Sequence, residues 1–515
     1  MSEAEPRPLR GWDAATWRGA EGSTSLRSPL VGVMVLDKAP DWQRLTERMD
    51  RVTRVVPRLR ERPLRGPLPF GSPRMAVDPD FDLSFHLRRY RLPSPATWDD
   101  VLDESRRQSL AGFDNARPLW RATLLEGLPG GRAVFVMKLH HALADGQAAV
   151  ALGAALFDFT PDAAALDDGP PAPDAVALDP VALLASSLRD GVDLLAGMAV
   201  GAASRMLPAL RDLAESPVDA TQNLITTMRS VWRFTNVPDG PLSPLMRGRS
   251  STYRFGTFSF RFSQLQAVAR SHNQSINDVF MAAVAGGMRR YHERHGVEVE
   301  ELRFNLPISL REPGVEAANA VTIARFHVPI AEANPEVRMR IIGETVSKWR
   351  AEPALGFADG LADLSRFVPV ELLAQAARAS DVTTSNVVGV PVPVYLVGSQ
   401  VLQMFPLVAT IGAAVNVTMI TYDGKAEVGF SADEAALDDI ENLIEDLREG
   451  FGEVLGHTPT ADSPLELDLA DPSSTDQSEG FPVPKSDKNV SSSARSIATG
   501  GRNPRPPRKP TQPPK

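Results

Sequence analysis

The chain has 515 residues, of which 43% are hydrophobic and 23% charged, so disorder along its whole length is excluded. Its formal net charge is −9, which gives no reason to expect nucleic-acid binding. It has no cysteine, which excludes disulfides, Cys-ligated metals and a cysteine-linked acyl-enzyme. The N-terminus lacks an apolar signal segment, and no stretch reaches about 18 consecutive apolar residues. We therefore expect a cytoplasmic protein without a transmembrane helix.

The first 160 residues alternate short apolar runs with segments of helical periodicity. Leu30–Leu36 predicts a buried strand, and Asp41 can cap a helix that ends near Pro57. Trp98–Leu110 predicts a second helix. Two more strands are expected over Trp120–Leu125 and Ala133–Leu139, followed by an Ala-rich helix over Gln147–Phe157.

The middle of the chain changes character. Residues 160–182 are rich in Pro, Asp and Ala and predict a solvated linker. Residues 181–233 have a helical, loosely amphipathic pattern. Their apolar face is expected either to pack on the second half of the protein or to lie on a membrane or lipid droplet.

The second half returns to mixed strands and helices. Ser275 can cap a helix with Asp278 three residues on, and Asp423-Gly424 is a strong two-residue hairpin signal. The other elements expected are strands over Phe258–Phe262, Leu302–Ile308, Val321–Ile330, Val392–Leu396, Val401–Phe405, Ala413–Tyr422 and Lys425–Phe430, and helices over Pro335–Ala351 and Glu434–Leu455. Lys485–Lys515 has eight basic residues and one acid, which predicts a disordered basic tail.

The most informative segment is His140-His141-xxx-Asp145-Gly146, at a junction between a predicted strand and a predicted helix. Histidine is the natural general base near neutral pH. Asp145 can orient a histidine or pair with a basic residue, and Gly146 permits unusual backbone angles. Adjacent histidines also occur as ordinary core or surface residues, and the segment lacks a third ligand at zinc spacing.

This HHxxxDG pattern resembles the signature of the CoA-dependent acyltransferase superfamily. Further motifs are similar to those of its wax ester synthase/diacylglycerol acyltransferase group, in the same order along residues 12–456. They are Pro118-Leu119-Trp120 after Arg117, Asn277-Asp278-Val279-Phe280, Asn305–Arg311, and Ser385-Asn386-Val387 followed by Gly389. Val388 and Val390 stand where the group has prolines, which puts the acyl or acceptor preference in doubt.

The resemblance implies two mixed α/β subdomains like chloramphenicol acetyltransferase, arranged in a V with a tunnel at their interface. On this interpretation residues 1–160 form the N-terminal subdomain with HHxxxDG, and residues 161–245 form a linker with connecting helices. Residues 246–458 form the C-terminal subdomain, and residues 459–515 are a disordered tail.

The resemblance also implies roles for the motif residues. His141 is expected to be the general base, with His140 supporting packing or orientation. Asp145 is expected to be structural, pairing with Arg311, and Gly146 to be conformational. The remaining expectations are that Asn277 donates to the oxyanion or positions a substrate, that Asp278 caps its helix, that Pro118, Leu119 and Trp120 pack in the core, and that Ser385 and Asn386 line the tunnel.

The activity implied is transfer of a fatty acyl group from acyl-CoA to diacylglycerol or a long-chain fatty alcohol, without cofactor, metal or nucleic acid. Lipid acceptors suggest peripheral contact with the inner face of the membrane or with lipid droplets. Two alternatives stay open: a superfamily relative acting on another acceptor, and a non-catalytic lipid-binding protein of the same fold. The remaining histidines carry no motif, and His292 and His295 are expected on the surface.

Overall fold

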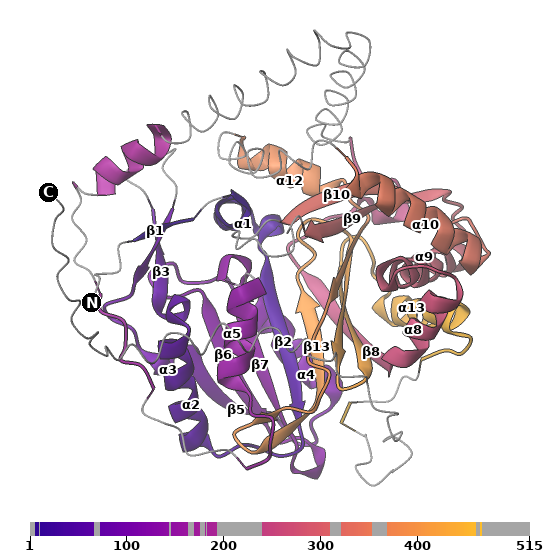
Figure 1. Cartoon of the computed structure of the whole chain (residues 1–515). Helices are drawn as coiled ribbons and strands as arrows, with labels where there is room; N and C mark the ends of the chain where they lie inside the picture. Colours follow the sequence, from indigo (N-terminus) through magenta and orange to yellow (C-terminus); the bar gives the residue numbers. More distant parts are fainter. Residues whose placement is uncertain are drawn as a thin grey trace, which may run out of the picture. The chain divides into compact units, whose positions relative to one another are not determined.

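Two six-stranded sheets, each covered by helices, make up most of the structure (Figure 1). The structure is a computed structural model, and it describes residues 6–9, 11–65, 73–143, 146–162, 169–175, 181, 183–192, 239–309, 321–352, 368–459 and 464–465. The tail beyond residue 465 and the connection over 193–238 therefore lie outside the described residues, as do Asp145 and Arg311.

The first sheet has the strand order β12-β13-β2-β7-β6-β5. Its strands are β2 (Pro29–Leu36), β5 (Leu87–Arg91), β6 (Trp120–Glu126), β7 (Ala133–His140), β12 (Tyr395–Leu396) and β13 (Ser399–Val408). One face packs against α2 (Trp42–Val55) and α5 (Gly146–Leu156), and the other against α4 (Trp98–Leu110). Both faces are buried, which explains the nearly continuous apolar runs in its central strands.

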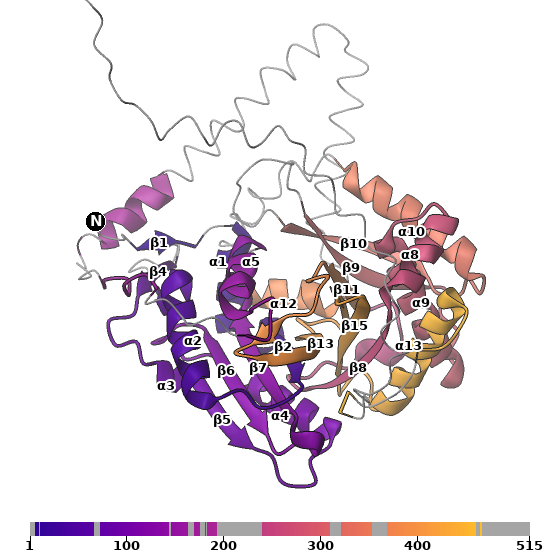
Figure 2. The same cartoon turned by 60° about the horizontal axis from the view of Figure 1, so that its bottom comes forward.

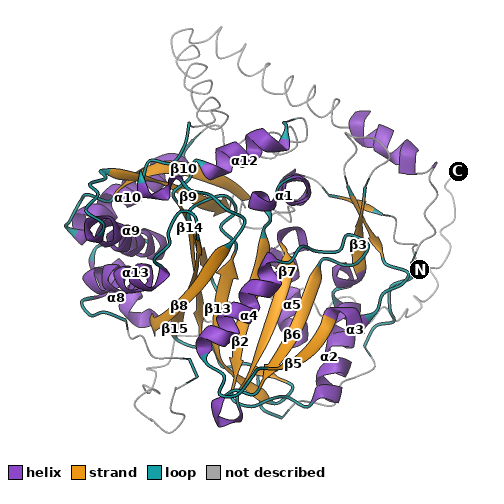
Figure 3. Ribbon diagram, turned by 180° about the vertical axis from the view of Figure 1, so that it is seen from behind, coloured by secondary structure: helices purple, strands orange, loops and turns teal. Residues whose placement is uncertain are grey.

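The second sheet has the order β10-β9-β11-β14-β15-β8. Its strands are β8 (Tyr253–Arg261), β9 (Glu301–Ser309), β10 (Val321–Pro329), β11 (Val382–Val387), β14 (Val415–Tyr422) and β15 (Lys425–Asp433). Four helices gather on one face (Figure 3): α8 (Phe262–Ser271), α9 (Ile276–Arg294), α10 (Pro335–Arg350) and α13 (Ile440–Leu455). The opposite face is polar over several strands, as described below.

Smaller elements surround the two sheets. They are a three-stranded sheet of β1 (Arg7–Pro8), β4 (Arg74–Val77) and β3 (Glu61–Leu64), the helices α1 (Gly11–Gly22), α3 (Leu83–His86) and α12 (Val370–Arg378), and the 3-10 turns η1 (Thr24–Leu26), η2 (Pro57–Arg60), η3 (Pro129–Gly131), η4 (His141–Leu143) and η5 (Leu245–Arg247). Helix α1 contacts both η4 and α12, so it joins the end of β7 to the second half of the chain.

The chain order does not separate the two sheets. Strand β13 lies in the second half of the sequence, yet it pairs with β2 in the first sheet, with Phe405 opposite Val33 (Figure 2). The expected C-terminal subdomain, residues 246–458, thus contributes two strands to the other sheet. Apolar strand patterns carry no information about which sheet a strand joins, so the sequence could not indicate this exchange.

Local signals predicted most helix starts and turns. Asp41 caps α2 by accepting from the Arg44 amide, and Ser275 with Asp278 forms a reciprocal capping box on α9. Asp423 and Gly424 both have positive φ, 45° and 75°, as a tight hairpin between β14 and β15 requires. These predictions are confirmed.

Two predicted boundaries are wrong. The strand expected over Phe258–Phe262 begins earlier, at Tyr253, and Phe262 already starts α8. The last helix was expected from Glu434 but begins at Ile440, where Asp439 accepts from the Asn442 amide. In both cases an apolar pattern continues through a turn, because neighbouring elements bury the same side of the chain.

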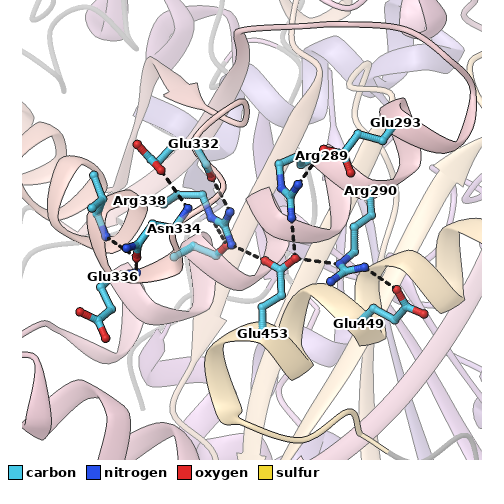
Figure 4. A network of polar contacts seen from close by, with 11 residues as sticks. Arg289, Arg290, Glu293, Glu332, Asn334, Glu336, Arg338, Glu449 and Glu453 are labelled. Carbon is cyan, nitrogen blue, oxygen red and sulfur yellow. Dashed lines mark hydrogen bonds and ion pairs between the residues drawn. The ribbon is translucent and has the colours of Figure 1, made fainter.

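Helices α9, α10 and α13 are tied together by a network of charged side chains (Figure 4). Arg338 is fully buried, and its guanidinium reaches Glu453 at 2.9 Å, the Ala282 carbonyl at 3.0 Å and the Glu332 carbonyl at 2.7 Å. Glu453 also accepts from Arg289 at 2.7 Å and Arg290 at 2.8 Å. Each of these arginines has a carboxylate partner, although the Nε of Arg289 is buried without a hydrogen bond to the described residues.

Candidate active site

The two histidines of the HHxxxDG motif lie where β7 ends. His140 is the last residue of β7, opposite Pro29 of β2, and its amide donates to the Leu119 carbonyl at 2.9 Å. His141 opens the short turn η4. The predicted position, a junction between a buried strand and a helix, is confirmed. Helix α5 then begins at Gly146, whereas Asp145 lies outside the described residues.

His140 is buried, with 4% of its surface exposed. Its Nδ1 accepts from the Ala142 amide at 3.1 Å, so the neutral ring carries its proton on Nε2. Burial, together with the nearby His141 and Lys138, lowers the pKa of His140 to about 3. His140 is therefore neutral at physiological pH, and its bond to Ala142 fixes both its tautomer and the turn that follows.

His141 keeps part of its surface accessible, while its Nδ1 is buried and finds no partner in the part of the chain that the structure describes. Burial lowers the pKa of His141, so the imidazole is unprotonated near neutral pH. An unprotonated imidazole with accessible surface can accept a proton from a bound hydroxyl group, which is what a general base requires.

A buried lysine lies beside the histidine pair, and the sequence analysis missed it. Lys138 is two residues before His140, hence on the same face of β7, and only 3% of it is exposed. Its Nζ donates to the Ala111 carbonyl at 2.5 Å and lies 4.0 Å from the centre of the Phe113 ring. That ring meets His140 edge-on at 5.7 Å. The signal was a single lysine in an otherwise apolar strand.

The Pro118-Leu119-Trp120 motif packs in the core next to this site, as expected. Trp120 is almost fully buried, its Nε1 donates to the Leu59 carbonyl at 2.7 Å, and its ring stacks on His86 at 4.6 Å. Leu119 is fully buried, and its carbonyl accepts from the His140 amide. The motif thus fixes the position of the strand end that carries the histidines.

The motif at the start of α9 divides into two parts. Asp278 forms the capping box with Ser275, as predicted. Asn277 is half-buried, and its amide nitrogen reaches only the Met281 sulfur at 3.4 Å, which is a weak acceptor. No hydrogen bond joins Asn277 to His140 or His141 among the described residues. The Asn277 amide therefore keeps most of its capacity to bind another group.

Ser385 and Asn386 are half-buried neighbours on β11, so their side chains point to opposite faces of the second sheet. Ser385 pairs with Thr418, on the face away from the helices, and Asn386 pairs with Met419, which belongs to the core beneath them. The loop that follows lacks the prolines of the family motif, but close backbone packing still constrains it. A Cβ at Gly389 would lie 2.0 Å from the Thr421 carbonyl oxygen, so only glycine fits there.

One histidine was predicted wrongly. His292 was expected on the surface, but it is 2% exposed on α9. Its Nδ1 donates to the Met288 carbonyl at 2.7 Å, and its Nε2 accepts from the Ser243 hydroxyl at 2.7 Å. The reason is helical periodicity, because His292 lies one turn after the buried Met288. His295 is exposed, as expected.

The chain matches two family models, the wax ester synthase/diacylglycerol acyltransferase catalytic domain over residues 9–280 and the C-terminal domain of the same family over residues 317–454. The chain belongs to the wax ester synthase/diacylglycerol acyltransferase family. A diacylglycerol O-acyltransferase of Mycobacterium tuberculosis is 33% identical over 443 residues, which cover 84% of this chain and 89% of that protein. The O-acyltransferase WSD of Acinetobacter baylyi is 26% identical over 72% of this chain and 81% of its own. As a member of this family, the protein is an acyltransferase.

Solved structures confirm the fold class. The wax ester synthase/diacylglycerol acyltransferase of Marinobacter aquaeolei has a TM-score of 0.58 at 19% identity and covers 87% of this chain and 98% of that one. The first condensation domain of the CDA synthetase has a TM-score of 0.54 at 15% identity and covers 91% and 99%. At these identities the likeness shows the mixed α/β fold alone.

None of the described helices is both long and apolar enough to cross a bilayer. The described part of the acyltransferase also lacks any group of three or more side chains suited to holding a metal ion.

Proposed function

We propose that this acyltransferase moves a fatty acyl group from acyl-CoA to the hydroxyl of diacylglycerol, of a long-chain fatty alcohol, or of both. The observation that carries the proposal is the position of His141, partly accessible at the end of β7 beside a His140 whose tautomer is fixed. The names of the relatives, diacylglycerol O-acyltransferase and O-acyltransferase, support the substrate class.

The proposed reaction needs no covalent enzyme intermediate. His141 takes the proton of the acceptor hydroxyl as the oxygen attacks the thioester carbonyl, and a carbon–oxygen bond forms. The tetrahedral intermediate then collapses, the carbon–sulfur bond breaks, and the CoA thiolate takes the proton back from the imidazolium. A pKa below its usual value keeps the imidazole in the unprotonated form that can accept this proton.

Three other motif residues have roles that remain proposals. Asn277 is proposed to donate to the developing oxyanion or to position a substrate, since among the described residues its amide has only a thioether partner. Asp145 is proposed to hold the turn after His141 by pairing with Arg311. Neither of these two residues is among those that the structure describes. A double-mutant cycle of Asp145→Asn and Arg311→Gln is therefore the direct test of that pair.

The proposed activity is tested by release of free CoA from palmitoyl-CoA, with diacylglycerol and with hexadecanol as acceptors. We expect His141→Ala to lower turnover about 10²- to 10⁴-fold. The matched control is His295→Ala, an exposed histidine that is expected to change nothing. Turnover with only one acceptor assigns that substrate. No turnover with either acceptor by folded protein contradicts the proposal, and full activity of His141→Ala contradicts the assigned base.

Lipid acceptors also require contact with a lipid surface, and one described segment suits it. Residues 183–192 are helical, and Leu184, Leu188 and Val192 are exposed by 40%, 55% and 64% at four-residue spacing. Asp190 fixes the segment to Arg74 at 2.5 Å. We expect Leu184→Ser with Leu188→Ser to weaken flotation with vesicles of phosphatidylcholine and diacylglycerol. Equal flotation of variant and wild type would show that this helix is not the contact.

A further inference from the structure

The face of the second sheet that points away from its helices carries a row of polar residues. In each of five neighbouring strands, one polar residue is the register partner of the next: Arg325 on β10, Asn305 on β9, Thr383 on β11, Asn416 on β14 and Ser431 on β15. The residues beside them, Phe326, Phe304, Val382, Val415 and Phe430, belong to the core under the helices. Alternation along a strand therefore directs the polar row to the opposite face.

Most of the polar side chains in this row form hydrogen bonds within the protein. Asn305 accepts from the Ser380 hydroxyl at 3.0 Å, and Asn416 donates to the Ala409 carbonyl at 3.0 Å. Ser431 donates to the Val408 carbonyl at 2.6 Å. The β14–β15 end of the row is thus bonded to residues at the end of β13. Arg325, at the β10 end, is the exception.

Arg325 makes no hydrogen bond or ion pair with any described residue, and its Nε is buried without a partner. The residue is half-buried, so the guanidinium is partly desolvated and still reachable. The neighbouring Arg303 adds a second positive charge. Asp381, the carboxylate near Arg303, already accepts from three backbone amides, those of Leu242, Ser243 and Arg303.

A partly desolvated cation without a counter-charge is costly, and proteins keep such groups where a ligand supplies the missing charge. The planar guanidinium is suited to the oxygens of a phosphate or carboxylate. The neighbouring side chains in the row, Asn305 and Thr383, are neutral hydrogen-bonding groups that do not repel an anion. Among the described residues, the row therefore ends in an anion-binding group that no carboxylate fills.

The geometry points to Arg325 as a binding residue for a phosphate group of the acyl donor. This inference rests on the proposed function. Diacylglycerol and fatty alcohols carry no charge, so acyl-CoA is the one substrate of that reaction with an anionic group. Arg325 then contributes to recognition of the donor and takes no part in bond making or breaking.

The test compares three acyl donors: palmitoyl-CoA, palmitoyl-3′-dephospho-CoA, which lacks one phosphate, and S-palmitoyl-pantetheine, which lacks all the phosphates together with the adenosine. For palmitoyl-CoA, we expect Arg325→Gln to raise KM about tenfold or more with little change in kcat, and Arg325→Lys to recover part of the loss. For S-palmitoyl-pantetheine, both variants should equal wild type. The dephospho donor shows which phosphate is bound. An equal rise of KM for all three donors would overturn the inference.

Two further measurements separate this inference from the proposed function. Calorimetry with CoA alone needs no turnover: wild type that does not bind CoA contradicts the proposed donor, whereas equal binding by wild type and Arg325→Gln overturns only the role of Arg325. Thermal unfolding checks for a structural role, because removal of an unpaired cation should not lower Tm. A large fall in Tm would overturn the inference. Arg340→Gln, an exposed arginine paired with Glu344 on α10, is the matched control.

Discussion

Two buried cations, one in each half of the molecule, are treated in opposite ways. Arg338 lies in the helix layer of the second sheet and has Glu453 and two carbonyls around its guanidinium. Lys138 lies in the first sheet, beside the histidine pair, and has one carbonyl and the face of the Phe113 ring. No carboxylate of the described residues pairs with it. The comparison indicates that buried charge is neutralised where it holds helices together and left unneutralised near the candidate active site.

The largest effect on stability is expected from removing the carboxylate that neutralises Arg338. Glu453→Ala leaves Arg338 buried beside Arg289 without its carboxylate, and loss of one partner of a buried pair costs about 3–5 kcal/mol. Urea unfolding followed by circular dichroism measures it. The control, Glu441→Ala, removes an exposed partner of Arg254 and should stay within about 0.5 kcal/mol of wild type. Similar losses in both variants would show that the Arg338 network contributes nothing special.

The sequence predicted features set by neighbouring residues better than those set by contacts between distant parts of the chain. Helix caps such as Ser275 with Asp278 and the Asp423-Gly424 turn depend on residues within a few positions of one another, so local chemistry is sufficient to find them. The position of His140 and His141 at a strand end follows from the same local pattern. The motif residues of the family could be named from the sequence, and of these Asp145 and Arg311 lie outside the described residues.

The remaining features depend on contacts between distant parts of the chain. Lys138 is recognisable as unpaired only when the loop that carries Ala111 and Phe113 is in place. Arg325 stands out only once five strands are aligned in register. The pairing of β13 with β2 and the burial of His292 against Ser243 are likewise long-range events. Periodicity indicates which side of an element is buried, but not what lies opposite.

The other half of the comparison, Lys138, is tested through the pH dependence of stability. Burial, with the nearby Arg121 and Arg27, lowers the pKa of Lys138 to about 7. Between that pH and the usual lysine pKa, the unfolded chain binds a proton that the folded protein does not, so stability rises with pH. We expect wild type to gain about 2 kcal/mol from pH 7 to 9 relative to Lys138→Met. Parallel curves for the two proteins would mean that Lys138 keeps its charge at a normal pKa.

The smallest expected effect concerns a buried acid without a cation, Glu427 of β15. It accepts from the Ser259 hydroxyl, but its Oε1 and the Oε1 of Gln403 on β13 are both buried without a partner. A proton on the carboxyl group supplies the donor that these two oxygens lack. Burial raises the pKa of Glu427 to about 7, so the neutral acid is the form that fits between the two sheets.

The sign of this effect is opposite to that of Lys138. Above the usual glutamate pKa, the unfolded chain releases a proton that the folded protein keeps, so stability falls as pH rises and levels off beyond about 7. From pH 5.5 to 7, wild type should lose about 1–2 kcal/mol relative to Glu427→Gln, whose amide stays neutral and can donate to Gln403. The measurement is the urea midpoint of both proteins at each pH. If Glu427→Gln loses stability in step with wild type, the carboxyl group is already ionised in the folded protein, and an unneutralised negative charge lies between β13 and β15.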